Sequence, residues 1–202
     1  MYKRQGQQAR LPQALSLSGF GCVLIDGHQM ELSVQVATLA RRHGVPVLFD
    51  GGSWKPGTAE LLPLVDVALV SADFRVPGFE GDVLDYLSQA GCLVVAQSHG
   101  ADPLEYAVGE YRVDVAVPHV EPVDTTGAGD CLHGALAHAI SCAGLHTDRV
   151  EELFRFATRA ASCSCLGRSA RGWLDNASLV NDVLALLPAP GRPQSRRVAL
   201  RE

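Results

Sequence analysis

The chain has 202 residues, of which 47% are hydrophobic and 19% charged, a composition typical of one globular domain with a substantial core. The formal net charge of -5 gives no general basis for binding nucleic acid or an anionic membrane, so any phosphate recognition must be local. No apolar run is long enough to cross a bilayer, and the polar segment before Gly21 lacks the apolar core of a signal peptide, which indicates the cytoplasm.

Strands and a helix alternate in the first part of the chain. The apolar run Cys22 to Ile25 predicts a strand that ends in Asp26-Gly27-His28, and Val45 to Phe49 predicts a fully buried strand that ends at Asp50-Gly51-Gly52. Val65 to Val70 is a third such run. Between the first two strands we expect a helix that Gly44 ends. The predicted inner stripe of this helix consists of Leu32, Val36, Leu39, Ala40 and His43.

This alternation favours a parallel sheet with right-handed crossovers, in which ligands bind beyond the carboxyl ends of the strands. Four polar side chains are expected at those ends: Asp26, Asp50, Ser71 and Ser98. Asp26 and Asp50 are candidates for contact with a substrate, although a carboxylate that caps the following turn is the alternative. The run Cys92 to Ala96 predicts the strand before Ser98, and Ser98-His99-Gly100 predicts a hairpin.

The segment Val123-Asp124-Thr125-Thr126-Gly127-Ala128-Gly129-Asp130 places a Gly-Ala-Gly turn and a carboxylate at the start of a periodic helix. The apolar positions of that helix are Leu132, Ala135, Leu136, Ala139, Ile140 and Ala143, and we expect His133 and His138 to lie off this face. The unpaired N–H groups of a helix start attract an oxyanion, and glycine lets it approach the backbone. The segment therefore predicts an anion site at Gly127, Ala128 and Gly129 beside Asp130. A turn with capping side chains is the alternative.

The residues from Asp124 to Asp130, followed by a helix of small residues, resemble the C-terminal signature of the PfkB (ribokinase-like) carbohydrate kinases. The resemblance implies that Asp130 is the base that accepts the proton of the acceptor hydroxyl. It implies that the amides of Gly127, Ala128 and Gly129 hold the charge that develops on the transferred phosphoryl group. Phosphoryl transfer depends mainly on positioning and electrostatic stabilisation, which a set of N–H donors and one carboxylate can supply.

The same resemblance implies further nucleotide contacts and a cation site. Ser98-His99-Gly100 looks like the family's Thr-x-Gly beside the nucleotide phosphates, with Pro103 in place of a usual second glycine. Asp124 and Thr126 resemble positions around a monovalent cation (K⁺), for which turn hydrogen bonds are the alternative. Ser71-Ala72-Asp73-Phe74 departs from the family's Asn-x-x-Glu element, so no magnesium ligand is assigned. Mg²⁺ is still expected with ATP.

After the motif, a second apolar stripe predicts another helix, with Val150, Leu153, Phe154, Ala157, Ala160 and Ala161 on its inner face. By resemblance, the loop after it forms one wall of the adenine pocket and gives Gly167 a nucleotide contact; a tight turn between helices is the alternative. A last helix is expected near Leu179 to Leu187. The six cysteines have no Cys-x-x-Cys spacing, which favours reduced core thiols over zinc ligands or disulfides.

The expected fold class is α/β, a ribokinase-like three-layer sandwich with a mostly parallel sheet, whose N-terminal part and lid are missing. Residues 21–187 are expected to form this partial nucleotide-binding and catalytic domain, and 188–202 a flexible tail. Residues 1–20 are expected to be a leader outside the family, beginning with an assembly scar at Met1 to Gln5. Sheet edges left uncovered would favour a homodimer or aggregation.

The function implied is ATP-dependent phosphorylation of a hydroxyl on a small carbohydrate, with no nucleic-acid or membrane partner. A nucleoside acceptor is one alternative, and a catalytically silent nucleotide-binding module is another. A dinucleotide-binding oxidoreductase is disfavoured, because no Gly-x-Gly-x-x-Gly follows the first predicted strand.

Overall fold

The computed structural model describes residues 11–12 and 14–191, and within them six strands form one sheet in sequence order. The strands are β1 (Val23–Ile25), β2 (Val47–Gly51), β3 (Val67–Ser71), β4 (Val94–His99), β5 (Asp102–Val108) and β6 (Tyr111–Val115). Strands β1 to β4 run parallel, whereas β5 and β6 are added by antiparallel pairing. The predicted parallel strands and the hairpin after Ser98 are confirmed, with Gly100 at φ +68° in its turn.

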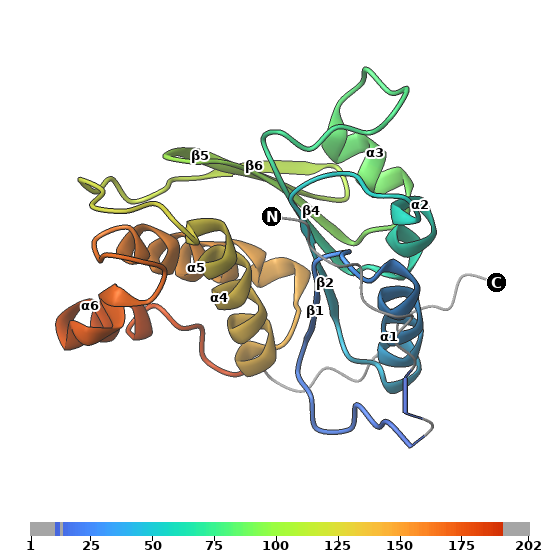
Figure 1. Cartoon of the computed structure of the whole chain (residues 1–202), viewed down its shortest axis with the longest axis horizontal. Coiled ribbons are helices and arrows are strands. Elements are labelled where there is room, and N and C mark those ends of the chain that lie inside the picture. Colours follow the sequence, from blue (N-terminus) through green and yellow to red (C-terminus); the bar gives the residue numbers. More distant parts are fainter. Residues whose placement is uncertain (1–10, 13, 192–202) are drawn as a thin grey trace, which may run out of the picture.

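Helices cover both faces of this sheet (Figure 1). One face carries α1 (Met30–His43), the short α2 (Thr58–Leu61) with the 3₁₀ turn Leu62–Leu64, and α3 (Val83–Gln89). The other carries α4 (Ala128–Ala143), α5 (Val150–Ser164) and α6 (Ala177–Leu184), with 3₁₀ turns at Thr147–Arg149 and Gly172–Asp175. The predicted fold class, an α/β three-layer sandwich with a mostly parallel sheet, is therefore confirmed.

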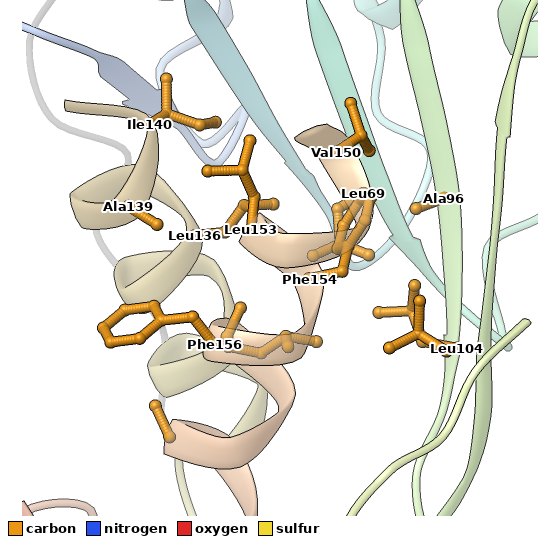
Figure 2. Close-up of a cluster of buried hydrophobic side chains, with 14 of the residues drawn as sticks. Leu69, Ala96, Leu104, Leu136, Ala139, Ile140, Val150, Leu153, Phe154 and Phe156 are labelled. Carbon is orange, nitrogen blue, oxygen red and sulfur yellow. The ribbon is translucent and has the colours of Figure 1, made fainter. Parts of the chain in front are cut away.

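Two cores lie on opposite faces of the sheet because successive strand side chains point to opposite sides. In β3, Leu69 packs with α4 and α5, whereas Ala68 and Val70 pack on the α1 side. Figure 2 shows the α4–α5 core, in which Phe154 is fully buried and its ring centroid lies 5.2 Å from that of Tyr106. The central strands are buried on both faces, which is why they read as continuous apolar runs.

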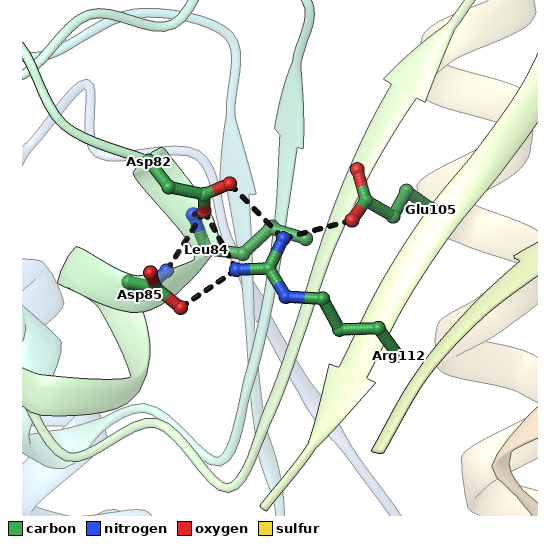
Figure 3. Close-up of polar contacts among 5 residues, drawn as sticks. All are labelled: Asp82, Leu84, Asp85, Glu105 and Arg112. Carbon is green, nitrogen blue, oxygen red and sulfur yellow. Dashed lines mark hydrogen bonds and ion pairs between the residues drawn. The ribbon is translucent and has the colours of Figure 1, made fainter. Parts of the chain in front are cut away.

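A charged cluster ties α3 to the β5–β6 hairpin (Figure 3). The guanidinium of Arg112 on β6 donates to Asp82 at 3.0 Å, to Asp85 at 2.6 Å and to Glu105 at 2.9 Å. Asp82 is also the N-cap of α3, accepting the backbone N–H groups of Leu84 and Asp85. The hydrogen bond from Arg112, more than any other contact, holds the pKa of Asp82 below its usual range.

The structure corrects several details of the sequence analysis. Helix α1 ends at Gly44 as predicted, but its buried face is Ser33, Ala37 and Ala40. His43 is exposed, and Leu32, Val36 and Leu39 are only half-buried. Small residues let this helix lie close to the sheet, which leaves the larger apolar side chains at its flanks. The last helix, α6, ends at Leu184 rather than near Leu187.

His133 does not lie off the buried face of α4. Its side chain is 5% exposed and points at the sheet together with Leu132, Leu136 and Ile140. The prediction was wrong because the apolar stripe was drawn from apolar residues alone, whereas the buried arc of the helix includes this histidine. His138 is exposed, as predicted.

Parts of the predicted end segments fall outside the described residues. The proposed scar at Met1 to Gln5 and most of the tail predicted over residues 188–202 are not described. Leu17, inside the predicted leader, is buried in the α1-side core. Among residues 11–12 and 14–191, all cysteines are free and no helix has the length and apolar character needed to span a bilayer.

Candidate active site

The turn before α4 is built by Asp124 and Gly127. One carboxylate oxygen of Asp124 accepts the N–H of Thr126 at 2.9 Å, and the other accepts the N–H of Ser169 at 2.8 Å. These hydrogen bonds, that from Thr126 first, hold the pKa of Asp124 below its usual range. Gly127 caps the helix at φ +78°, and a Cβ there would lie 2.7 Å from that of Ala170. Both the backbone angle and the close contact require glycine at this position.

Three backbone N–H groups at the start of α4 have no acceptor within the described part of the chain: those of Gly127, Gly129 and Asp130. The N–H of Ala128, which the sequence analysis included in the anion site, instead donates to the carbonyl of Thr125 at 3.2 Å. A Cβ built on Gly129 would meet no atom within 4 Å. The first turn therefore offers free donors beside open space, as an anion site requires.

A cavity of about 490 Å³ lies between β1, α1 and the start of α4. Its lining residues are Val23, Leu24, Ile25, Asp26, Gln29, Leu32, Ser33, Val36, Asp50, Asp130 and His133. Three carboxylates that are far apart in the sequence, Asp26, Asp50 and Asp130, thus reach one hollow. Asp130 joins this cavity to the free N–H groups of the turn. Leu32 and Val36 of α1 form part of its apolar wall, which is why they are not packed against the sheet.

Asp50 lies within β2 rather than beyond it, and its side chain is 23% exposed. Burial raises its pKa above the usual range, and the negative charges of Asp130 and Asp26 act in the same direction. His133 opposes them, with its Nε2 atom 3.5 Å from the Asp50 carboxylate. The sequence analysis missed His133, although its spacing of three and seven residues from Leu136 and Ile140 would have placed it on the buried face.

The remaining candidate residues lie outside the lining of this cavity. The hydroxyl of Ser98 is 3.5 Å from the carbonyl of Val70, and Gly100 lies in the hairpin turn. Gly167 approaches the backbone so closely that a Cβ would lie 2.3 Å from the nitrogen of Trp173. Its loop borders the anion turn through Ser169 and Ala170, which contact Asp124 and Gly127. In the described residues, no three His, Cys, Asp or Glu side chains gather to hold a metal ion.

The profile of the pfkB family carbohydrate kinase matches residues 7–176, which is most of the chain. The chain belongs to the pfkB family of carbohydrate kinases. This family match begins earlier than residue 21, where the sequence analysis begins the domain, and the division into leader, domain and tail stays a prediction.

Related pfkB-family proteins include known ribose and riboside kinases. The ribokinase of Bacillus subtilis is 29% identical over 158 residues, which cover 75% of this chain and 50% of that protein. The aminoimidazole riboside kinase of Salmonella enterica, solved with aminoimidazole riboside and an ATP analogue, superposes with a TM-score of 0.69 at 25% identity, covering 81% of this chain and 62% of that one.

Arabidopsis thaliana ribokinase, solved with ribose and ATP, gives a TM-score of 0.65 at 28% identity, over 83% of this chain and 55% of that one. The chain spans about half or less of the length of the curated relatives it matches.

Proposed function

We propose that this chain is the nucleotide-binding and catalytic portion of an ATP-dependent sugar kinase. The observation that carries the proposal is the position of Asp130, whose carboxylate lines the cavity while its own N–H and that of Gly129 are free donors. One helix turn thereby presents a base to a hydroxyl and an N–H cradle to a phosphate. Membership of the pfkB family supports the same interpretation.

In the proposed reaction, Asp130 accepts the proton of the acceptor hydroxyl while that oxygen attacks the γ-phosphorus of ATP. The bond from the γ-phosphorus to the oxygen bridging it to the β-phosphate breaks, and ADP leaves. The free N–H groups of Gly127, Gly129 and Asp130 stabilise the charge that develops on the transferred group. Mg²⁺, when bound with ATP, neutralises part of the phosphate charge.

The acceptor is expected to be a small carbohydrate. Asp26 and Asp50 line the cavity, and carboxylate oxygens are suited to accept hydrogen bonds from sugar hydroxyls, although one oxygen of Asp26 also accepts the N–H of His28 at 3.0 Å. A riboside acceptor is a second candidate, because the chain is similar to an aminoimidazole riboside kinase. Nucleotide contacts at Ser98, Gly100 and Gly167, K⁺ at Asp124 and Thr126, a homodimer and a cytoplasmic location stay predictions from the sequence.

The Asp130→Asn variant tests the assignment of the base. It keeps the shape of the side chain but accepts no proton, so we expect sugar-dependent ADP formation to fall by about 10²- to 10⁴-fold. Binding of ATP is expected to change by less than about twofold, because the substitution leaves the backbone donors in place. Turnover is measured with a panel of pentoses, hexoses and ribosides.

Asp114→Asn is the matched control, since Asp114 is exposed on β6 and outside the cavity lining. It is expected to keep wild-type turnover. Wild-type turnover in Asp130→Asn would reject Asp130 as the base. ATP binding without ADP formation by the wild-type chain would instead favour a silent nucleotide-binding module.

A further inference from the structure

His133 is a buried side chain held among three groups from three elements. Its Nδ1 atom lies 2.8 Å from the carbonyl oxygen of Gly129, in the first turn of α4. Its Nε2 atom lies 3.0 Å from the carbonyl oxygen of Leu69 on β3 and 3.5 Å from the carboxylate of Asp50 on β2. The ring therefore bridges the helix turn that carries the candidate base to two central strands of the sheet.

The protonation state of the His133 ring decides how many of these hydrogen bonds it can donate. Carbonyl oxygens only accept hydrogen bonds, and a neutral imidazole carries one N–H, whereas the protonated ring carries two. The neutral ring can therefore donate either from Nδ1 to the carbonyl of Gly129 or from Nε2 to the groups on the sheet, whereas the protonated ring can donate to both. An apolar side chain of similar size would leave the carbonyl oxygens of Gly129 and Leu69 without this partner, which is costly at a buried site.

We propose that His133 is a positioning residue, which fixes the first turn of α4 against the sheet and pairs with Asp50, so that Asp130 is left as the free carboxylate of the cavity. The consequence for turnover rests on the proposed function. The bridge itself does not, because it is a property of the folded chain that can be measured without substrate.

The titration of Asp50 reports on its pairing with His133, which is one of several charged groups that face this carboxylate. His133 and Asp130 face it from α4, Asp26 from the end of β1, and Lys55 from the loop after β2. Burial is the main cause of its raised pKa, and His133 is the largest influence that lowers it. Removing the imidazole should therefore move the titration of Asp50 further upward.

The first experiment follows the carboxyl carbon of Asp50 by NMR during a pH titration of the full chain. His133→Gln is expected to raise the pKa of Asp50 further, because an uncharged amide replaces the imidazole that lowers it. His138→Gln is the matched control: it changes an exposed histidine of the same helix and should leave the titration unchanged. An unchanged titration of Asp50 in His133→Gln would overturn the pairing.

The bridge can also be tested in the wild-type chain, which removes any dependence on the folding of a variant. A ring N–H of His133 bonded to a buried carbonyl should exchange with water much more slowly than the ring N–H of exposed His138. Equally fast exchange at the two rings would overturn the bridge.

The kinetic test separates positioning from a purely structural role. His133→Gln is expected to lower kcat by about tenfold or more, because the base and the anion site shift together. The KM for ATP should rise as well, because the N–H groups proposed to hold the phosphates belong to the same turn, whereas a purely structural role would lower the folded fraction and leave the KM of the folded protein unchanged. His133→Asn, whose shorter amide stays near the carbonyl of Gly129 but does not extend to Leu69 and Asp50 on the sheet, should lose at least as much of kcat as His133→Gln does.

The outcomes distinguish this proposal from the proposed function. Wild-type kcat in both folded variants would overturn the positioning role while leaving Asp130 as the base. If the wild-type chain turns over no acceptor, the proposed function fails, and the Asp50 titration and the exchange of the ring N–H still decide whether the bridge exists.

Discussion

At the scale of single residues, Asp50 is the carboxylate whose ionisation the fold opposes. Burial and the neighbouring charges of Asp130 and Asp26 raise its pKa in the folded chain. The folded state therefore holds the proton of Asp50 more tightly than the unfolded state does. The contribution of Asp50 to the free energy of unfolding therefore declines as the pH rises from the ordinary pKa of aspartic acid through the raised pKa of the folded chain.

Asp50→Asn should consequently be more stable than the wild-type chain at pH 7, because the buried charge is removed. The difference should shrink as the pH falls below the ordinary range of aspartic acid, where both states are protonated. Thermal unfolding at neutral and acidic pH measures it, with exposed Asp114→Asn as the control. A lower Tm for Asp50→Asn than for the wild-type chain at pH 7 contradicts this account.

Single residues differ in how well the sequence predicts them. The Gly-Ala-Gly turn and Asp130 could be placed at a helix start, because turn glycines and apolar spacing are local signals. Two contacts of the site could not be predicted. The N–H of Ala128 donates to the carbonyl of Thr125, which depends on the geometry of the turn. His133 is held by the carbonyl oxygens of Leu69 and Gly129, which lie 64 and 4 residues away in the sequence.

At the scale of elements, Arg112 is the main polar link between α3 and the β5–β6 hairpin in the described residues. Its guanidinium reaches three carboxylates, and the hydrogen bond to Asp82 lowers the pKa of a group that also caps α3. Because the folded pKa of Asp82 is lowered, its contribution is present above the ordinary pKa of aspartic acid. That contribution is lost as the pH falls through the lowered value.

Arg112→Met should lower the free energy of unfolding by about 1 kcal/mol, since Arg112, Asp82 and Asp85 are more than one-third exposed, Glu105 is nearly so, and solvent screens their charges. Urea unfolding at neutral pH measures the loss, which should shrink in high salt. Arg155→Met, which breaks only an exposed pair with Glu151 on α5, is the control and should cost a few tenths of a kcal/mol. Equal losses in the two variants would show that the cluster adds nothing beyond one surface pair.

The elements that could be predicted are those with strong periodicity. Strands β1 to β4 and helices α1, α4 and α5 follow from apolar runs and three- or four-residue spacing. Helix α3 has seven residues and begins at an Asp82 cap, and α2 has four, so neither is long enough to show a stripe. Only the start of the β5–β6 hairpin could be predicted, because its strands alternate buried and exposed residues irregularly.

At the scale of the whole molecule, the sheet order brings the candidate site together. Parallel strands β1 and β2 carry Asp26 and Asp50 to the same end of the sheet, and α4 begins there with Asp130. The alternation of strands and helices predicts that meeting point. The partners of each carboxylate depend on side-chain packing between elements, which no local pattern contains.

The most direct test of the central claim is a calorimetric titration of ATP with Mg²⁺ into the chain and two glycine variants. A Cβ on Gly129 or on Gly134, both in α4, meets no atom within 4 Å, so alanine fits at either position. Of the two glycines, only Gly129 belongs to the turn that carries the free N–H groups, where a methyl group would crowd a bound phosphate.

We predict that the wild-type chain and Gly134→Ala bind ATP equally well, whereas Gly129→Ala binds at least about tenfold more weakly, a difference of about 1.4 kcal/mol. Equal binding by Gly129→Ala and Gly134→Ala, or no binding by the wild-type chain, would contradict the proposal that the start of α4 holds the phosphates of ATP.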